Sequence, residues 1–349
     1  MILKDQVVLI TGGTGSFGRK FTRIVLEHHA PKKLIIFSRD ELKQFEMKQE
    51  LGERPNVRYF LGDIRDSERL HQAFHGVDIV VHAAALKQVP ALEYNPFEAI
   101  KTNVIGAENI ITAAINQKVK KVVALSTDKA VNPINLYGAT KLCAEKLFVA
   151  GNSYSGDIKT RFSIVRYGNV VGSRGSVIPF FLEKKKSGVL PITDERMSRF
   201  WITLNQGVDL VLTALERMHG GEIFIPKIPS MNIMDLAKAI APDCKTKMVG
   251  VRPGEKISEV LLTEDEARHA LEFKDLYVIQ PDHPFWDREG GLHAGGKPLS
   301  AEFRYASDTN DWWLKPEEIL AILEKEARAT GSVENGPQRS AARETSPIK

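Results

Sequence analysis

The chain has 349 residues, of which 43% are hydrophobic and 26% charged, a composition typical of a soluble globular protein with one large core or two joined lobes. Its 48 Lys and Arg against 44 Asp and Glu give a net charge of only +4, and the basic run at residues 184–186 is better explained as a solvated helix face than as a nucleic-acid site. The start of the chain is charged where a signal peptide would be apolar, and no segment reaches the roughly 18 to 20 apolar residues that span a bilayer, so we expect a cytoplasmic protein that binds neither nucleic acid nor membranes.

Short apolar runs rich in β-branched residues alternate with amphipathic segments over the first 168 residues. The runs predict strands at residues 7–10, 34–37, 57–61, 79–82, 122–125 and 162–165. The segments 96–117 and 136–150 predict two of the helices between them. Because the strands are apolar throughout and separated by helices, we expect an α/β protein with a Rossmann-like, doubly wound parallel sheet covered on both faces.

A glycine-rich turn follows the first predicted strand and opens a helix. Glycines let the backbone turn tightly and approach a pyrophosphate, whose charge then lies at the helix N-terminus. The turn predicts a dinucleotide site that includes Gly12, Thr14, Gly15, Ser16, Phe17 and Gly18.

The end of the second predicted strand reads Ser38-Arg39-Asp40, without a carboxylate placed to accept from the ribose of NAD. Arg39 instead offers a fork of donors suited to a 2′-phosphate, with Ser38 beside it, so we expect NADP rather than NAD. The alternative is that Arg39 caps the sheet edge or pairs with Asp40. The other expected cofactor contacts are Asp40, Lys43, Asp63, Ile64, Ala83, Ala84, Lys87, Asn103, Ser126, Tyr137 and Lys141.

Tyr137 and Lys141 are four residues apart on a predicted helix and therefore share a face. A free phenol has a pKa of about 10, and we expect a nearby ammonium and an oxidised nicotinamide to favour the phenolate. Tyr137 would then take a proton from a sugar hydroxyl while hydride leaves the same carbon, with Thr127 completing the constellation. Asp128 and Lys129 supply a second acid and base, which an enzyme that eliminates water needs. The alternative for this pair is a salt-bridged turn after a strand.

The two cysteines, Cys143 and Cys244, have no motif spacing, and Cys143 falls on an apolar helical face. We expect both to be reduced and to behave as small buried hydrophobic residues.

The pattern of predicted elements changes after about residue 168, where the elements are shorter and are separated by Gly and Pro. We expect residues 1–168 to form an NADP-binding domain and residues 169–329 a smaller, interleaved substrate lobe. Residues 281–298 predict a long surface loop, 316–328 a closing helix, and 330–349 a disordered tail. His283 and His293 are ten residues apart in flexible sequence, so no metal site is expected.

On the basis of these residues and motifs, the chain resembles the extended short-chain dehydrogenase/reductases that act on nucleotide sugars. More narrowly, it resembles the inverting UDP-N-acetylglucosamine 4,6-dehydratases of the pseudaminic-acid type. The resemblance covers residues 4–280 and the closing helix. It rests on the motifs at residues 11–18, 38–44, 82–87, 126–130, 136–141, 166–176 and 252–256.

The resemblance implies UDP-N-acetylglucosamine as substrate, tightly bound NADP that is recycled in each turnover, and a homo-oligomer, with a hexamer among the expected sizes. It implies oxidation at C4, loss of water across C5 and C6, and return of the hydride to C6. Tyr137 would be the base at the C4 hydroxyl, Lys129 the base at C5 and Asp128 the acid for the leaving hydroxyl. Lys129 can be that base only if burial or a neighbouring positive charge lowers its pKa, and Lys87 and the nicotinamide are the candidate neighbours. The residues expected to bind the substrate are Lys87, Asn169, Val177, Arg199, Arg252 and Glu255.

Two other functions stay open on the sequence. A UDP-sugar 4-epimerase would use the same cofactor and tyrosine but would not need Asp128 and Lys129. A non-catalytic, dinucleotide-sensing protein could dispense with Tyr137 and Lys141 as well.

Overall fold

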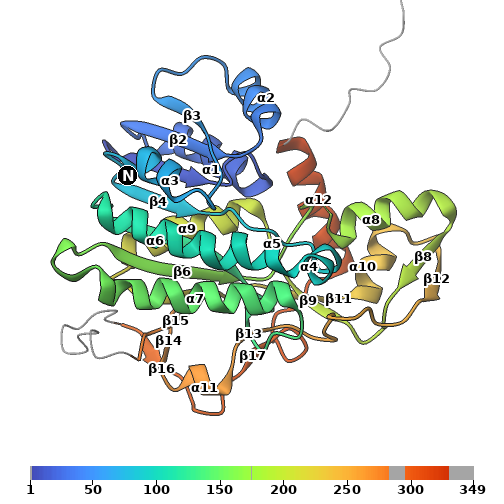
Figure 1. The fold of residues 1–349 in the computed structure, drawn as a ribbon. Coiled ribbons are helices and arrows are strands. Elements are labelled where there is room, and N and C mark those ends of the chain that lie inside the picture. The colour runs from blue at the N-terminus through green and yellow to red at the C-terminus, as the bar shows by residue number, and fades with distance from the viewer. Residues whose placement is uncertain (1, 174, 283–294, 330–349) are drawn as a thin grey trace, which may run out of the picture.

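A mostly parallel ten-stranded sheet forms the centre of the computed structural model, which describes residues 2–173, 175–282 and 295–329. The sheet order is β3 (Val57–Leu61), β2 (Lys33–Ser38), β1 (Val7–Thr11), β4 (Ile79–His82), β5 (Lys121–Thr127), β6 (Arg161–Tyr167), β10 (Ile223–Pro226), β15 (Leu276–Ile279), β14 (Ala270–Glu272) and β16 (Lys297–Pro298). Strands from β3 to β10 run parallel, whereas β15, β14 and β16 are antiparallel to their neighbours. All six predicted strands are present, and the predicted Rossmann-like α/β class is confirmed (Figure 1). The predicted tail and most of the predicted loop, with His283 and His293, lie outside the described residues.

Helices cover both faces of this sheet, which explains why its central strands are apolar throughout. One face carries α1 (Ser16–His28) and α9 (Leu204–Arg217), which pack together. The other carries α3 (Ser67–Phe74), α6 (Gly106–Asn116) and α7 (Leu136–Tyr154), and α2 (Glu41–Leu51) connects β2 to β3. In Figure 1, α6 and α7 lie in front of the sheet and α9 behind it.

The predicted long helix at residues 96–117 is interrupted by a wider turn. It consists of α5 (Pro96–Ile100), the π-helical turn η1 (Lys101–Ile105) and α6, and α4 (Val89–Tyr94) precedes it. Single π turns inside α-helices often mark functional sites. Here the π turn buries Asn103, which exchanges two 2.9 Å hydrogen bonds with the backbone of Leu86 and donates to Thr140 Oγ1 at 3.0 Å. The turn therefore fixes the loop after β4 against α7.

The buried stripe of α7 also corrects the prediction for Cys143. Lys141, Ala144, Glu145 and Phe148 are buried on that helix, whereas Cys143 is exposed. The apolar pattern around Cys143 belongs to its neighbours in the sequence, and the residue itself lies off the face that packs on the sheet. Cys244 is half-buried, and both thiols are free.

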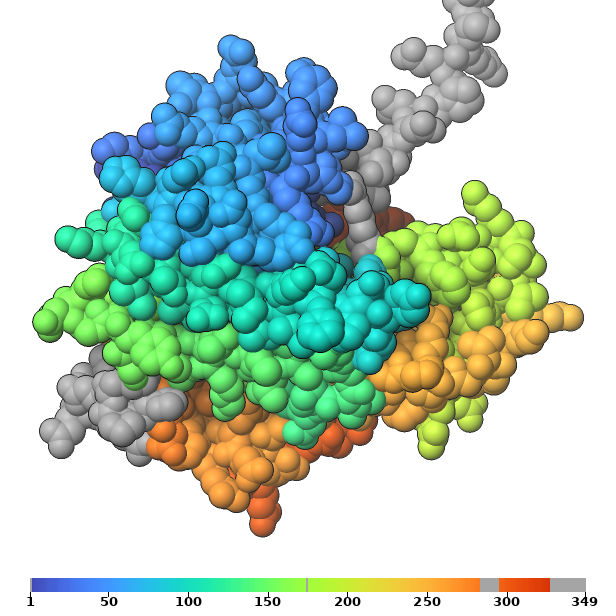
Figure 2. Space-filling model, viewed as in Figure 1, coloured from blue at the N-terminus to red at the C-terminus, as the bar shows by residue number. Residues whose placement is uncertain are grey.

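The second part of the chain builds a lobe with its own core and also contributes strands to the main sheet. The lobe contains β7 (Asn169–Val170), α8 (Val177–Lys184), β8 (Val189–Ile192), β9 (Ser198–Ile202), β11 (Ser230–Asn232), α10 (Ile233–Ile240), β12 (Lys245–Met248), β13 (Val260–Leu262), α11 (Glu264–Ala267), β17 (Tyr305–Ala306) and α12 (Pro316–Ala329). Short 3₁₀ turns lie at η2 (Asp128–Ala130), η3 (Gly156–Ile158) and η4 (Lys185–Ser187). The unit formed by α8, β8, α10 and β12 projects to the right in Figures 1 and 2.

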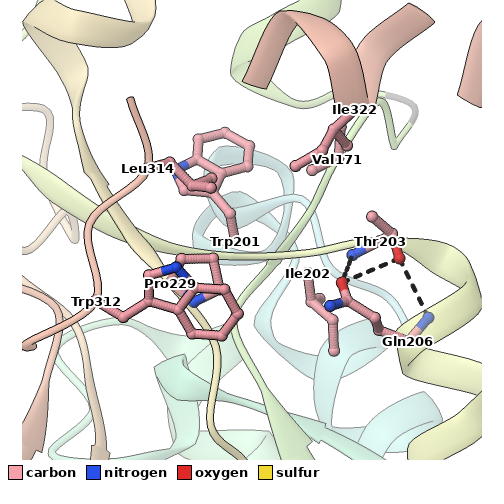
Figure 3. A pocket seen from close by; sticks show the side chains of 9 residues that line it. All are labelled: Val171, Trp201, Ile202, Thr203, Gln206, Pro229, Trp312, Leu314 and Ile322. Atoms are coloured by element: carbon pink, nitrogen blue, oxygen red, sulfur yellow. Dashed lines mark hydrogen bonds between the residues drawn. The ribbon is translucent and has the colours of Figure 1, made fainter. Parts of the chain in front are cut away.

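The segment that leads into α12 seals the core of this lobe. Leu314 and Ile322 line a small cavity of about 60 Å³ together with Trp201 of β9 (Figure 3). At its edge Thr203 caps α9: its backbone N–H donates to Gln206 Oε1 at 2.9 Å, and its hydroxyl accepts from Gln206 N at 3.2 Å. The small volume and apolar lining identify this cavity as packing space. No helix within the described ranges has both the length and the apolar character needed to cross a bilayer.

A buried ionic cluster joins the two parts of the protein. Arg166 of β6 is 1% exposed and binds Glu145 of α7 at 2.6 and 3.1 Å and Glu266 of α11 at 2.9 and 3.1 Å. It also donates to the carbonyl oxygen of Leu261 at 3.0 Å. We call Arg166, Glu145 and Glu266 the lobe-joining cluster.

Candidate active site

A cleft with a volume of about 1180 Å³ lies between the carboxyl ends of the sheet strands and the second lobe. Open α/β sheets bind ligands at this edge because the loops after the parallel strands converge there. The structure brings almost every predicted site residue to the cleft wall, from Gly12 in the first turn to Glu255 in the second lobe. The exceptions are Asn103 and Asp128, which are buried behind that wall.

The glycine-rich turn has the geometry of an anion cradle. Gly12 has φ +65°, and a Cβ there would lie 2.9 Å from the backbone of Ala84. A Cβ on Gly18 would lie 2.4 Å from the carbonyl oxygen of Gly13. Helix α1 therefore packs against the turn so closely that there is no room for a side chain at this position. Gly15 provides no side-chain cap, which leaves the first N–H groups of α1 available to a ligand.

Two hydroxyl groups on the cleft wall also fit a bound dinucleotide. Thr102 Oγ1 and Ser126 Oγ are buried and have no hydrogen-bond partner among the described residues. Buried hydroxyl groups in folded proteins are ordinarily hydrogen-bonded, so these two are suited to polar atoms of a ligand. Together with the turn, they make the residues present compatible with a dinucleotide cofactor.

The residues at the end of β2 do not form the Arg39–Asp40 ion pair that was one alternative on the sequence. Asp40 does not pair with Arg39: it caps α2 by accepting from Lys43 N at 3.0 Å and also binds the Lys43 ammonium. Arg39 is 56% exposed, with Nη1 3.8 Å from Asp63 Oδ2. Its guanidinium therefore extends into the open end of the cleft. Ser38 Oγ accepts from Gln44 at 3.0 Å.

Tyr137 and Lys141 line the cleft, but their electrostatics differ from the prediction. Burial raises the pKa of Tyr137 to about 12, and the ammonium that opposes this effect most strongly is that of Lys129. Lys141 donates to the carbonyl oxygen of Leu125 at 2.7 Å, and burial lowers its pKa to about 8 although Glu145 raises it. The expected shift towards the phenolate is thus absent from the protein without cofactor, because burial outweighs the attraction of Lys129.

The segment after β5 places one acid and one base together. Asp128 is fully buried, and its Oδ1 accepts from Thr127 Oγ1 at 2.8 Å and from Lys129 Nζ at 3.1 Å. Lys129 and Thr127 line the cleft, and Lys129 Nζ also donates to Asn169 Oδ1 at 3.4 Å. Burial raises the pKa of Asp128, which suits an acid.

The pKa of Lys129 moves in the direction opposite to the prediction. Burial lowers it, but the carboxylates of Asp128 and Glu259 together outweigh burial, so the net pKa is raised. The expected lowering by Lys87 is reversed: burial and the charge of Lys129 lower the pKa of Lys87. Lys129 is consequently an ammonium in the resting protein.

One further residue, Glu259, is indicated by no motif in the sequence, and the second lobe brings it to Lys129 with Oε1 3.4 Å from Nζ. Glu259 is three residues past the end of the motif at Arg252–Lys256, close to other charged residues in the sequence. Nothing local distinguishes it from a surface acid, because its partner is 130 positions away. We call Asp128, Lys129 and Glu259 the cleft cluster.

The two arginines expected to bind the substrate, Arg199 and Arg252, lie on the second lobe and differ in exposure. Arg252 is 56% exposed, with Nη1 3.9 Å from Glu255 Oε1. Arg199 is mostly buried and donates to the carbonyl oxygens of Lys256 at 2.8 Å and Ile257 at 2.9 Å. Arg252 is thus open to a ligand, whereas Arg199 also holds the segment that carries Glu259. Val177, at the start of α8, lines the cleft as well.

Comparison with known proteins agrees with this arrangement. The family model described as polysaccharide biosynthesis protein matches residues 8–281. A protein of Campylobacter jejuni named UDP-N-acetylglucosamine 4,6-dehydratase (inverting) is 54% identical over 323 residues, which cover 90% of this chain and 96% of that protein. A UDP-glucose 4-epimerase of Rickettsia conorii is 47% identical over 286 residues, 80% of this chain and 84% of the epimerase.

A solved structure extends the likeness over nearly the whole chain. The X-ray structure of Pen from Bacillus thuringiensis has a TM-score of 0.86 and 41% identity, covering 93% of this chain and 99% of that one. The protein therefore belongs to the short-chain dehydrogenase/reductases of the polysaccharide biosynthesis protein family and, within them, to the inverting UDP-N-acetylglucosamine 4,6-dehydratases.

Proposed function

We propose that the protein is an NADP-dependent UDP-N-acetylglucosamine 4,6-dehydratase that inverts C5. Its product would be UDP-2-acetamido-2,6-dideoxy-β-L-arabino-hex-4-ulose. The observation that carries the proposal is the Asp128–Lys129 pair, an acid and a base 3.1 Å apart, beside Tyr137 in the same cleft. The 54% identity to a protein named for this reaction supports it.

A bound nicotinamide dinucleotide would supply the hydride acceptor for C4 and the hydride donor for C6. Tyr137 takes the proton of the C4 hydroxyl in the oxidation. The resulting ketone acidifies the C5 proton, which Lys129 removes as the C6 hydroxyl leaves with a proton from Asp128. One water molecule is lost across C5 and C6, and a proton added to the opposite face of C5 completes the inversion.

The pair generates its acid and its base in one proton transfer. Lys129 as an ammonium is not a base, and Asp128 as a carboxylate is not an acid. A proton moved from Lys129 Nζ to Asp128 Oδ1, 3.1 Å away, makes both neutral, and burial favours the neutral pair because it penalises each charge. Asp128 is fully buried, so its proton would reach the leaving hydroxyl through Thr127 Oγ1, which lies 2.8 Å away and lines the cleft.

The choice of NADP rests on Arg39. Its exposed guanidinium stands at the end of β2, where the adenosine ribose of a dinucleotide on the glycine-rich turn would lie. The remaining cofactor contacts are proposed for the residues of β2 to β5 that line the cleft. Lys87, Asn169, Val177, Arg199, Arg252 and Glu255 are proposed for the nucleotide sugar.

The wider setting is proposed from the family relation. It comprises a nucleotide-binding domain of residues 1–168, a substrate lobe of residues 169–329, a homo-oligomer in the cytoplasm, and a product that enters pseudaminic acid formation. Size-exclusion chromatography with light scattering tests the oligomer directly.

Proton NMR of the product tests the reaction. Incubation of the purified protein with UDP-N-acetylglucosamine in deuterated water, without added cofactor, is expected to give a 4-keto-6-deoxy sugar labelled at C5. The second candidate function is a UDP-sugar 4-epimerase, which the 47% identity to a protein named so favours. An epimerase would return an unlabelled C4 stereoisomer, and a dinucleotide-sensing protein would return the substrate unchanged.

A further inference from the structure

Glu259 stands immediately before β13 and is held in place by its own backbone. Its N–H donates to Ser307 Oγ at 2.9 Å, and its carbonyl oxygen accepts from Ser307 N at 2.8 Å. Ser307 Oγ in turn lies 2.8 Å from Oγ of Ser198, the first residue of β9. Glu259 is 2% exposed, so its carboxylate occupies a fixed, desolvated position on the second lobe.

Charged groups from three elements face this carboxylate. Lys129 Nζ, from η2, is 3.4 Å from Oε1; Lys256 Nζ is 3.5 Å from Oε2; and Arg199 Nε, from β9, is 4.0 Å from Oε1. Glu259 in turn acts on Asp128, on the other side of Lys129, as a like charge. Glu259 Oε2 has ion-pair contact with Lys256 but no hydrogen-bond partner among the described residues.

We propose that Glu259 is a positioning residue of the dehydration reaction, which anchors Lys129 from the second lobe and sets the pH range over which the Asp128–Lys129 pair carries one proton. This inference rests on the proposed function. It assigns a role to a side chain that lines the cleft but takes no part in the proton transfers described above.

The surrounding charges lower the pKa of Glu259 and raise that of Asp128, so the two carboxyl groups favour opposite protonation states. Burial raises the pKa of Glu259, but Lys129, Arg199 and Lys256 outweigh burial, so its net pKa is lowered and it stays ionised. Burial raises the pKa of Asp128, and the negative charge of Glu259 raises it further. Carboxyl groups separated in this way divide the acid role from the charged role. Glu259 therefore remains the anion while Asp128 becomes the acid.

Glu259 acts on both members of the pair in the same direction. A negative charge raises the pKa of a neighbouring carboxylic acid and also that of a neighbouring ammonium. It therefore leaves the transfer between Lys129 and Asp128 nearly unchanged but raises the pH at which the pair gains a second proton and the pH at which it loses its last one. Without Glu259, that proton would be lost at lower pH.

The test is the pH profile of kcat for the Glu259→Gln variant, which keeps the shape and removes the charge. Both limbs of the profile are expected to move towards lower pH by about one unit, since a charge at this distance shifts a pKa by that order. Glu259→Asp keeps the charge and is expected to keep the wild-type profile. Glu266→Gln, in the lobe-joining cluster, is the matched control and is expected to lose stability without moving the profile.

A profile of Glu259→Gln that is uniformly lower but superimposes on the wild type would overturn the inference and leave Glu259 as a structural ion pair. If Glu259→Gln does not fold, Lys256→Met is an independent test. Loss of the cation beside the Glu259 carboxylate is expected to move the pH profile towards higher pH. An unmoved profile would also overturn the inference. If the wild-type protein forms no 4-keto-6-deoxy sugar, it is the proposed function that fails.

Discussion

The lobe-joining cluster and the cleft cluster contain the same kinds of buried side chain but are completed to different degrees. In the lobe-joining cluster, all four carboxylate oxygens of Glu145 and Glu266 accept a hydrogen bond from Arg166. In the cleft cluster, Asp128 Oδ2 and Glu259 Oε2 are buried without a hydrogen-bond partner among the described residues. One cluster is saturated, and the other retains capacity for a proton or a ligand.

The difference separates a structural ionic network from a reactive one. A saturated network has no low-energy proton transfer available, because each oxygen and each N–H is already engaged. An incomplete network in a low dielectric is costly, and proteins retain such groups chiefly at functional sites. The second lobe contributes one carboxylate to each cluster, Glu266 and Glu259, so the same docking of the lobes completes both.

Breaking the cleft cluster at Lys129 is expected to have the largest effect on activity. Lys129→Met removes the base at C5, and loss of a general base typically costs about 100- to 10,000-fold in rate. We expect the kcat for the 4-keto-6-deoxy sugar to fall within that range, measured by NMR of the product. Deuterium uptake at C5 should fall in parallel, and a near wild-type rate would remove Lys129 from the elimination.

Breaking the lobe-joining cluster is expected to cost stability instead. Arg166→Met leaves the buried carboxylate of Glu145 and the half-buried carboxylate of Glu266 without their cation, and removal of one partner of a buried ion pair costs about 3–5 kcal/mol. The measurement is urea unfolding followed by fluorescence, with Lys129→Met as the comparison. A loss below about 1 kcal/mol would show that water or rearrangement replaces the guanidinium, and the two clusters would then not differ as argued.

The features that the sequence predicted are those encoded locally. The six strands, the turn at Gly12 and the pair at Tyr137 and Lys141 depend on periodicity and short spacing, and the structure places them as expected. Glu259 could not be found in this way, because only the fold brings it to Lys129. The lowered pKa that Lys129 needs as a base is absent from the protein without cofactor for the same reason: the sequence shows its positive neighbour Lys87 but not the second carboxylate, Glu259.

The glycine-rich turn allows strain to be separated from steric contact. Gly12 and Gly52 both have positive φ, +65° and +67°, but a Cβ on Gly12 would meet the backbone of Ala84 whereas Gly52 has nothing within 4 Å. Both Gly→Ala substitutions should cost about 1–3 kcal/mol of backbone strain. Only Gly12→Ala is expected to weaken dinucleotide binding as well, by about tenfold or more, measured by fluorescence titration. Equal binding by the two variants would place the dinucleotide away from this turn.

Substitution of Arg39 is expected to have the smallest effect, a change in the preference for NADP over NAD. Its guanidinium makes only a 3.8 Å approach to Asp63 and is more than half exposed, so its loss should hardly change folding. A charge-assisted hydrogen bond to a phosphate is worth about 1.5–3 kcal/mol, which predicts a roughly 10- to 100-fold loss of NADP affinity in Arg39→Ala. Affinity for NAD, which lacks the 2′-phosphate, should stay within about threefold. Arg23→Ala, another partly exposed arginine paired with a glutamate on the surface, is the control. An unchanged ratio of the two dissociation constants in Arg39→Ala would contradict the assignment of NADP. Arg39 would then be a residue at the edge of the sheet whose one charged contact among the described residues is the weak approach to Asp63.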